Sequence, residues 1–268
     1  MPELPEVEHT RKNLDRWMRG ARIVEVRTRD DRIVRPMKPA SFVKGVTGRV
    51  IERIERRGKW LRLLLDDGMS VFTHLGMTGW FERGASTDHP LRFDRVTFEL
   101  SRKGVTSRVT YVDPRRWGRM VLTKEDLPVW SSLGPDPLDD GIDEAALADK
   151  LARRKKRSIK EALMDQKVLA GVGNIQAIEA LWKAKIDPRS PAGALTTSDI
   201  RAVTRGLRWT IDRTLADLAK GDGGAKNPFK IYGRKGEACP RCGEKLERLT
   251  LGGRTTTFCS ACQRRLRS

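Results

Sequence analysis

Apolar and polar positions in the first half of the chain change from a helical period to an alternating one. Val7, Leu14 and Met18 recur at the spacing of one helical face, and Gly20 follows as a helix-ending residue. Beyond Gly20, short apolar runs separated by turn residues predict strands over 22–27, 48–56, 60–65, 69–73, 95–100, 105–112 and 118–123. Many short strands joined by tight turns are typical of an antiparallel sandwich or barrel, here led by one helix.

The pattern of the second half is helical. A segment rich in Gly and Pro at 131–137 marks a linker. Candidate helices follow at 143–152, 158–164 and 175–184. From Ile200 to Leu218, apolar residues recur every three or four positions, which is the stripe of a buried helix face. Residues 220–228 are Gly-rich and polar and predict a loop, and the tail from Ile231 contains the four cysteines.

The chain is strongly basic. Among its 268 residues, 54 Lys and Arg stand against 35 Asp and Glu, a formal net charge of +19. A solvated surface does not need this imbalance, so we expect a polyanionic partner, with nucleic acid as the leading candidate. An anionic membrane surface is the alternative, but the sequence has no long basic amphipathic helix and no apolar run of spanning length. The first twenty residues lack the apolar core of a signal peptide, so we expect an intracellular protein.

Four cysteines form two close pairs. Cys239 and Cys242 are separated by two residues, and after sixteen further residues Cys259 and Cys262 repeat the spacing. Two such pairs can converge on one tetrahedral zinc with Zn–S bonds of about 2.3 Å, and no position is then left for water. We therefore predict one structural zinc. Arg254 lies between the pairs, where a pinned hairpin can present its guanidinium to a phosphate; a plain solvent-exposed arginine is the alternative.

The first residues carry candidate chemistry. If Met1 is removed, Pro2 bears a secondary amine, and a chain-terminal amine with a pKa near 8 is about one-tenth or more unprotonated at neutral pH. That fraction can form an iminium with an aldehyde-like carbon, and the neighbouring Glu3 is a possible proton donor. The alternative is an ordinary helix start, with Pro5 in the first turn and Glu3 and Glu6 near the positive helix end.

Several glycine-flanked turns offer groups for nucleic acid. Asn174 follows two glycines, where it can cap the next helix and leave backbone N–H groups for a phosphate; a plain helix connection is the alternative. Met77 and Trp117 also lie on glycine-flanked turns. Such side chains usually pack into cores, but in a basic protein they can fill a duplex after a base has left the stack. The basic run 153–157 is either a solvated face or a phosphate contact.

Together these motifs resemble those of the family of bacterial formamidopyrimidine-DNA glycosylases and endonuclease VIII. The matching segments are Pro2–Glu8, His74–Gly79, Asp113–Gly118, Gly171–Ile175, Tyr232–Gly236 and the four cysteines, which cover nearly the whole chain in family order. The resemblance implies a multidomain α+β fold with DNA bound in a cleft between the two halves. We expect a β-sandwich at 1–130, a linker at 131–141, a helix–two-turn–helix domain at 142–230 and a zinc finger at 231–268.

The resemblance also implies residue roles. Pro2 would attack C1′ of the damaged nucleotide, and Glu3 would act as the acid that opens the sugar. Lys59 would assist β-elimination and hold phosphate, and Arg254 would serve δ-elimination. The remaining matches are Lys155 and Asn174 at phosphate-binding positions, Met77, Arg115 and Trp117 as the gap-filling trio, and Glu6 and Glu179 as auxiliary carboxylates.

Three departures from the family pattern bear on specificity. Trp117 stands where the family usually has phenylalanine, and Gln176 stands where tyrosine is common. The family's longer loop over oxidised guanine is shortened here to Gly221–Pro228, which puts 8-oxoguanine specificity in doubt and favours hydantoins, oxidised pyrimidines or abasic sites.

We therefore expect a bifunctional DNA glycosylase and AP lyase of base excision repair, acting as a monomer on damaged duplex DNA in the bacterial cytoplasm, without a redox cofactor. Two other classes are a non-catalytic, zinc-dependent DNA-binding paralogue and an RNA-binding zinc-ribbon protein. Binding alone requires none of Pro2, Glu3 and Lys59, so their presence argues against both.

Overall fold

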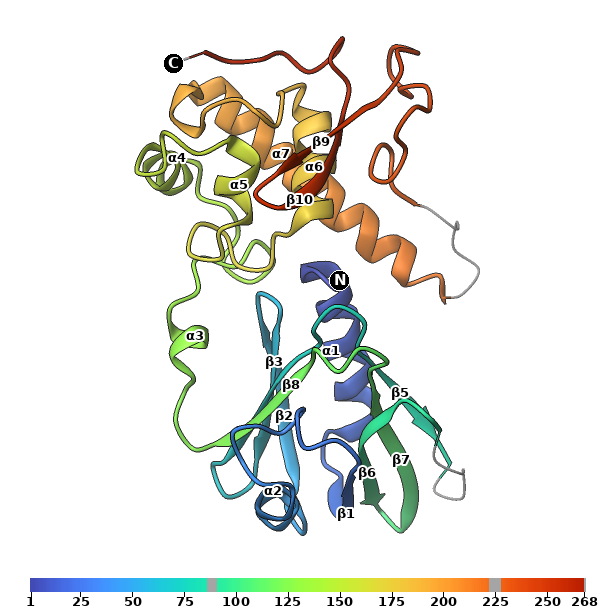
Figure 1. The fold of residues 1–268 in the computed structure, drawn as a ribbon. Coiled ribbons are helices and arrows are strands. Elements are labelled where there is room, and N and C mark those ends of the chain that lie inside the picture. Colours follow the sequence, from blue (N-terminus) through green and yellow to red (C-terminus); the bar gives the residue numbers. More distant parts are fainter. Residues whose placement is uncertain (86–90, 222–227, 268) are drawn as a thin grey trace. The chain divides into compact units, whose positions relative to one another are not determined.

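The computed structural model describes residues 1–85, 91–221 and 228–267. The chain forms two compact units (Figure 1). The first contains Met1–Pro2 and Glu6–Ser132, and the second contains Glu3–Pro5 and Leu133–Ser268. Residues Glu3–Pro5 therefore belong to the second unit, although the residues on either side of them belong to the first.

The first unit is a two-layer antiparallel sandwich preceded by helix α1 (Leu4–Met18). One sheet has the strand order β1 (Arg22–Thr28), β6 (Asp94–Arg102), β7 (Val105–Val112) and β5 (Trp80–Gly84). The other has the order β2 (Ile51–Arg57), β3 (Trp60–Leu65), β4 (Ser70–His74) and β8 (Arg119–Thr123). This confirms the predicted sandwich and its leading helix; the short helices α2 (Pro39–Val46) and α3 (Pro128–Ser131) were not predicted.

The sandwich core follows from the alternation of apolar residues along the strands. Leu61, Leu63 and Leu65 of β3 are buried, whereas the residues between them are partly exposed. Val7 and Leu14 of α1 pack into the same core. A buried leucine or valine stabilises a fold by about 1.5–3 kcal/mol before the entropy cost. The tight β2–β3 turn, with Gly58 at φ +58°, places Lys59 between the two strands.

The second unit is helical and ends in a small hairpin. Its elements are α4 (Glu144–Ala152), α5 (Ile159–Met164), α6 (Asn174–Ala184), the 3-10 turn η1 (Ala192–Ala194), α7 (Thr197–Leu218), β9 (Glu247–Leu251) and β10 (Arg254–Phe258). Helix α7 begins with a capping box between Thr196 and Asp199 and buries Ile200, Val203 and Leu207 of the predicted stripe. Gly206 permits close packing on α6, because a Cβ there would lie 2.5 Å from the Ala180 carbonyl oxygen.

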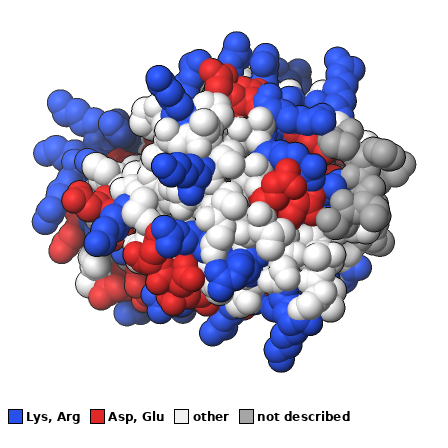
Figure 2. Space-filling view, turned by 90° about the horizontal axis from the view of Figure 1, so that it is seen from below, with Lys and Arg blue, Asp and Glu red and all other residues white. Residues whose placement is uncertain are grey.

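Within the described residues, no helix has both the length and the apolar character that crossing a membrane requires. On the face shown in Figure 2, Lys and Arg side chains project around the rim with Asp and Glu between them, while the middle consists mostly of other residues. The basic excess on this face is therefore dispersed and interrupted by acidic groups.

Candidate active site and metal centre

Helix α6 is capped by a carboxylate from the start of the chain. One oxygen of Glu3 accepts a hydrogen bond from the Ile175 N–H at 2.9 Å, and the other accepts from the Gln176 N–H at 3.0 Å. Gly173 makes this approach possible, because a Cβ there would lie 2.3 Å from the Glu3 carboxyl carbon. The prediction that Asn174 caps the helix was wrong: Asn174 is its first residue. Two of the N–H groups expected to face a phosphate are taken by Glu3.

The glycine-rich segment before α6 also fixes the next residue of the N-terminal peptide. The Leu4 N–H donates to the Gly171 carbonyl at 3.1 Å, and Gly171 has φ +86°. A Cβ at Gly171 would lie 2.7 Å from that of Leu4, so a larger residue would displace the peptide. Pro2 is half-buried and directly precedes this anchored pair.

Asn174 connects α6 to the hairpin that carries Arg254. Its side-chain amide donates to the Thr255 carbonyl at 3.0 Å. Arg254 is exposed at the start of β10, directly after Gly252 and Gly253, which both have positive φ. The two predicted phosphate-binding residues, Asn174 and Arg254, therefore belong to adjoining parts of one unit.

Sequence reasoning missed Lys160 of α5. Its side chain is fully buried, and within the described part of the chain its Nζ has no hydrogen-bond partner. Burial is the largest cause that lowers the pKa of Lys160, to about 8; Glu161 and Glu3 act to raise it and Arg254 to lower it. The only signal in the sequence is a lysine placed inside a short apolar helix. The structure thus adds a weakly basic amine to the surroundings of Glu3 and Arg254.

In the sandwich unit, the charge of Lys59 affects the pKa of a partly buried histidine, His74. Burial and then the charge of Lys59 lower the pKa of His74 to about 4, so the imidazole is neutral at physiological pH. Its Nδ1 accepts the Gly76 N–H at 3.1 Å, and its ring packs 5.0 Å from that of Trp60. Lys59 itself is partly exposed, as a residue that meets a phosphate must be.

The predicted gap-filling trio lies on two turns that touch. Met77 follows β4 and is half-buried. Trp117 follows β7 with 55% of its surface exposed, and the guanidinium of Arg115 stacks over its ring at 4.1 Å. A Cβ at Gly76 would lie 2.5 Å from the Trp117 carbonyl carbon, so the two turns pack backbone against backbone.

The basic run 153–157 lines, together with Asp165, a surface hollow of about 470 Å³. Lys155 is exposed there, while Arg154 donates to Asp165 at 2.7 Å. A hollow with so many cationic groups suits an anion such as a phosphate.

The two auxiliary carboxylates have different surroundings. Glu6 is half-buried in the first turn of α1. Glu179 of α6 is fully buried and accepts three backbone N–H groups, from Lys230, Ile231 and Tyr232, at 2.8–2.9 Å. The Glu179 carboxylate therefore anchors the segment that leads into the cysteine module.

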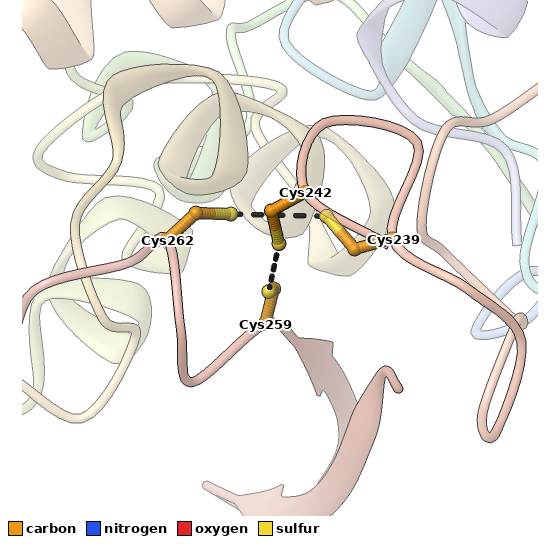
Figure 3. Close-up of side chains that lie close together, drawn as sticks. All are labelled: Cys239, Cys242, Cys259 and Cys262. Carbon is orange, nitrogen blue, oxygen red and sulfur yellow. Dashed lines mark hydrogen bonds between the residues drawn. The ribbon is translucent and has the colours of Figure 1, made fainter. Parts of the chain in front are cut away.

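The four cysteines form a metal centre (Figure 3). All four sulfur atoms lie within 4.8 Å of one another, with 3.7 Å between Cys239 and Cys262 and 3.5 Å between Cys242 and Cys259. Tetrahedral zinc with bonds of about 2.3 Å requires sulfur–sulfur distances of about 3.8 Å. The cluster therefore fits one structural zinc, with no ligand position left for water.

The surroundings of the cluster favour a thiolate at Cys239, whereas burial raises the pKa of Cys259 and Cys262. Burial acts to raise the pKa of Cys239, but the N–H groups of Arg241 and Cys242, among other hydrogen bonds, outweigh it and lower the pKa to about 6. Zinc binds cysteine as the thiolate.

Family models match three consecutive parts of the chain. The formamidopyrimidine-DNA glycosylase N-terminal domain matches residues 1–120, the H2TH domain of the same enzymes matches 133–223, and the zinc finger found in FPG and IleRS matches 236–265.

Whole proteins and solved structures agree with these matches. Formamidopyrimidine-DNA glycosylases from Laribacter hongkongensis and Rhizobium etli are 37% and 38% identical to the chain, with 98% of this chain and all of each relative covered. The structure of Lactococcus lactis Fpg in complex with abasic-site DNA has a TM-score of 0.89 at 30% identity, and MutM in complex with DNA containing carbocyclic 8-oxo-G has 0.89 at 31%. Both cover 98% of this chain and all of the compared chain. The chain thus belongs to the formamidopyrimidine-DNA glycosylase family.

Proposed function

We propose that this protein excises oxidised bases from duplex DNA and then cleaves the strand, with Pro2 as the nucleophile. Family membership makes it a DNA glycosylase of base excision repair; the covalent mechanism is our proposal. The main support for this mechanism is that the Glu3 carboxylate is anchored on α6, while the Leu4 N–H is bonded to the Gly171 carbonyl. These contacts fix the residue next to Pro2, as positioned catalysis requires.

The chemistry follows from the groups present. After removal of Met1, the lone pair of the Pro2 amine attacks C1′ as the bond to the damaged base breaks, and the base leaves with the bonding electrons and takes up a proton. Glu3 protonates the ring oxygen as the sugar opens, which gives an iminium between Pro2 and C1′. Loss of a proton from C2′, assisted by Lys59, then expels the 3′ phosphate, and a second elimination served by Arg254 expels the 5′ phosphate. Water then hydrolyses the iminium, which releases the sugar remnant as an unsaturated aldehyde and regenerates the Pro2 amine.

The remaining site residues would hold the DNA. We assign Lys155, Asn174 and Arg254 to phosphates, and Met77, Arg115 and Trp117 to the gap left by the everted nucleotide. Glu6 is assigned as an auxiliary carboxylate near Pro2, and Glu179 as the anchor of residues 230–232. Acting as a monomer, the protein would repair damaged duplex DNA in the bacterial cytoplasm, with residues 1–130 as its catalytic domain and 142–230 and 231–268 as its DNA-binding parts.

Borohydride trapping tests the nucleophile. Incubation of the mature protein with abasic-site duplex and borohydride should give a covalent complex, and mass spectrometry should place the adduct on Pro2. A variant with an uncleavable residue ahead of Pro2 turns the amine into an amide and should not be trapped, whereas Lys59→Ala should still be. An adduct on a lysine, or full activity with Met1 retained, contradicts the proposal. Binding without trapping would identify a non-catalytic paralogue.

A further inference from the structure

Asp113 is a buried acceptor at the junction of the two turns that carry Met77, Arg115 and Trp117. None of its surface is exposed. One carboxylate oxygen accepts the Thr78 hydroxyl at 2.7 Å and the Arg115 N–H at 3.2 Å. The other accepts the N–H groups of Trp117 and Gly118, both at 2.8 Å. A single side chain thus receives hydrogen bonds from both turns.

Tyr111 supplies a second connection between the same turns. Its hydroxyl lies 3.1 Å from the Leu75 carbonyl oxygen and 3.3 Å from the second oxygen of Asp113. Both neighbouring glycines leave room for this hydroxyl, because a Cβ would lie 2.1 Å from it at Gly79 and 1.7 Å from it at Gly118. One buried phenol therefore explains Gly79 and Gly118, whereas Gly76 faces the Trp117 backbone.

The Tyr111 hydroxyl stays protonated over the physiological pH range. Burial, and then the nearby Asp113 carboxylate, raise the pKa of Tyr111 far above its ordinary value, so the phenol remains a donor. Within the described part of the chain, no Lys or Arg forms an ion pair with the Asp113 carboxylate. Its partners are backbone N–H groups and two hydroxyls, which are fixed in direction and hold the turns in one geometry.

We infer that Asp113 and Tyr111 form a positioning pair that joins the two turns into one rigid wedge. Met77, Arg115 and Trp117 then enter the duplex together. The inference rests on the proposed function, because only an enzyme that everts a nucleotide needs a gap filled. Eversion costs stacking and pairing energy, and side chains held in place before the encounter offset that cost better than side chains on two independently moving turns.

The Arg115–Trp117 stack belongs to the same wedge. Asp113 holds the N–H groups of both residues, and the guanidinium lies over the indole ring. The orientation of Arg115 is therefore set in the free protein. Loosening of Asp113 should weaken discrimination of the base opposite the lesion as well as excision itself.

Mild variants test the coupling without unfolding the sandwich. Tyr111→Phe removes one hydroxyl, and Thr78→Val removes one donor to Asp113. Thr110→Val is the matched control, because this buried threonine lies on β7 and, among the described residues, its hydroxyl hydrogen-bonds to the hydroxyl of Thr97, at 3.4 Å. Amide hydrogen exchange is followed in the DNA-free protein over 75–79 and 113–118. Excision of a damaged base and cleavage of a pre-formed abasic site are measured on the same duplex.

We expect the two turns to respond together to a change in either one. Thr78→Val alters the first turn, yet exchange should accelerate in both turns, as it should in Tyr111→Phe but not in Thr110→Val. Base excision should fall about tenfold, the effect of one lost hydrogen bond. The excision rates opposite different bases should also become more similar to one another. Cleavage of a pre-formed abasic site should change less than about threefold, because no base has to be everted.

Two outcomes overturn the inference. In one, Thr78→Val accelerates exchange only in 75–79, so that the turns move independently. In the other, excision and abasic-site cleavage fall by equal factors. Linked exchange in a protein that cannot be trapped on abasic DNA would instead refute the proposed function and uphold the coupling.

Discussion

The Glu3 carboxylate and the backbone N–H of Ile175 lie 2.9 Å apart although 172 positions separate them in the chain. A negative group at a helix N-terminus satisfies free N–H donors and interacts favourably with the helix dipole. The proposed proton donor is thus also part of what holds the helical unit together. Its catalytic and structural roles should be separable by substitution.

Glu3→Gln should affect folding and catalysis to different extents. The amide retains one acceptor oxygen but places an NH2 group against a backbone donor, so we expect the free energy of unfolding to fall by about 1–2 kcal/mol. Base excision should fall much more than trapping on a pre-formed abasic site. Urea unfolding and single-turnover rates measure the two effects, with Glu144→Gln in the first turn of α4 as control. Unchanged stability together with unchanged excision would contradict the cap.

Loss of the metal centre should act through Arg254. Cys242→Ser removes a thiolate ligand, so zinc content should fall well below one per chain, and binding to abasic-site DNA should weaken about as much as in Arg254→Ala. The sandwich should keep its near-ultraviolet circular dichroism, because the cysteines lie in the other unit. Fully active protein without zinc by metal analysis would disprove the assignment.

The stability of the sandwich should depend on pH through His74. Its pKa is about 4 in the folded protein and about 6.5 when unfolded, so the unfolded state binds more protons between these values. Stability should therefore fall as the pH drops from about 6.5 to 4, by at most about 3 kcal/mol from this residue. His74→Gln keeps an acceptor for the Gly76 N–H and should lose this part of the pH dependence. An NMR titration of His74 with a midpoint near 6.5 would exclude the effect.

The lesion range should be broader than recognition of 8-oxoguanine alone. The shortened segment Gly221–Pro228 lies largely outside the described residues, so this prediction rests on the sequence. A pocket with fewer contacts discriminates less, and 8-oxoguanine opposite cytosine should be cut more slowly than hydantoins, oxidised pyrimidines, ring-opened purines or abasic sites. Single-turnover rates on matched duplexes give the order. Equal rates for 8-oxoguanine and hydantoins would show that another segment replaces the loop.

Local patterns predicted the elements well and their contacts poorly. The strands of the sandwich and the stripe of α7 were recognisable because one face of each is buried. Strand β5 was missed because Phe81 is its only buried residue, and α2 because eight residues give little periodicity. The zinc cluster was predictable because ligand spacing is a local property.

Contacts between distant segments escaped prediction for a physical reason. Asn174 has the side chain of a capping residue, but Glu3 occupies the helix end and Asn174 binds the hairpin instead. Lys160 and Glu179 look like surface charges in a helical pattern, yet both are fully buried. Their surroundings are formed by segments that are distant in the sequence. The local spacing of apolar residues therefore cannot predict that these two side chains are buried.

The anchoring of Leu4 to Gly171 has a practical consequence for preparing the protein. Glu3 and Leu4 are both held by hydrogen bonds to the second unit, and Pro2 directly precedes the first of these anchored residues. One additional residue moves the terminal amine by roughly 3.5 Å. Because Glu3 is fixed, the chain cannot shift to bring the amine back to the position that Pro2 provides. Under the proposed mechanism, an affinity tag fused ahead of Pro2 yields a folded but inert product. Recombinant protein must be tagged at the other end, and its specific activity will report how completely the expression host trims methionine.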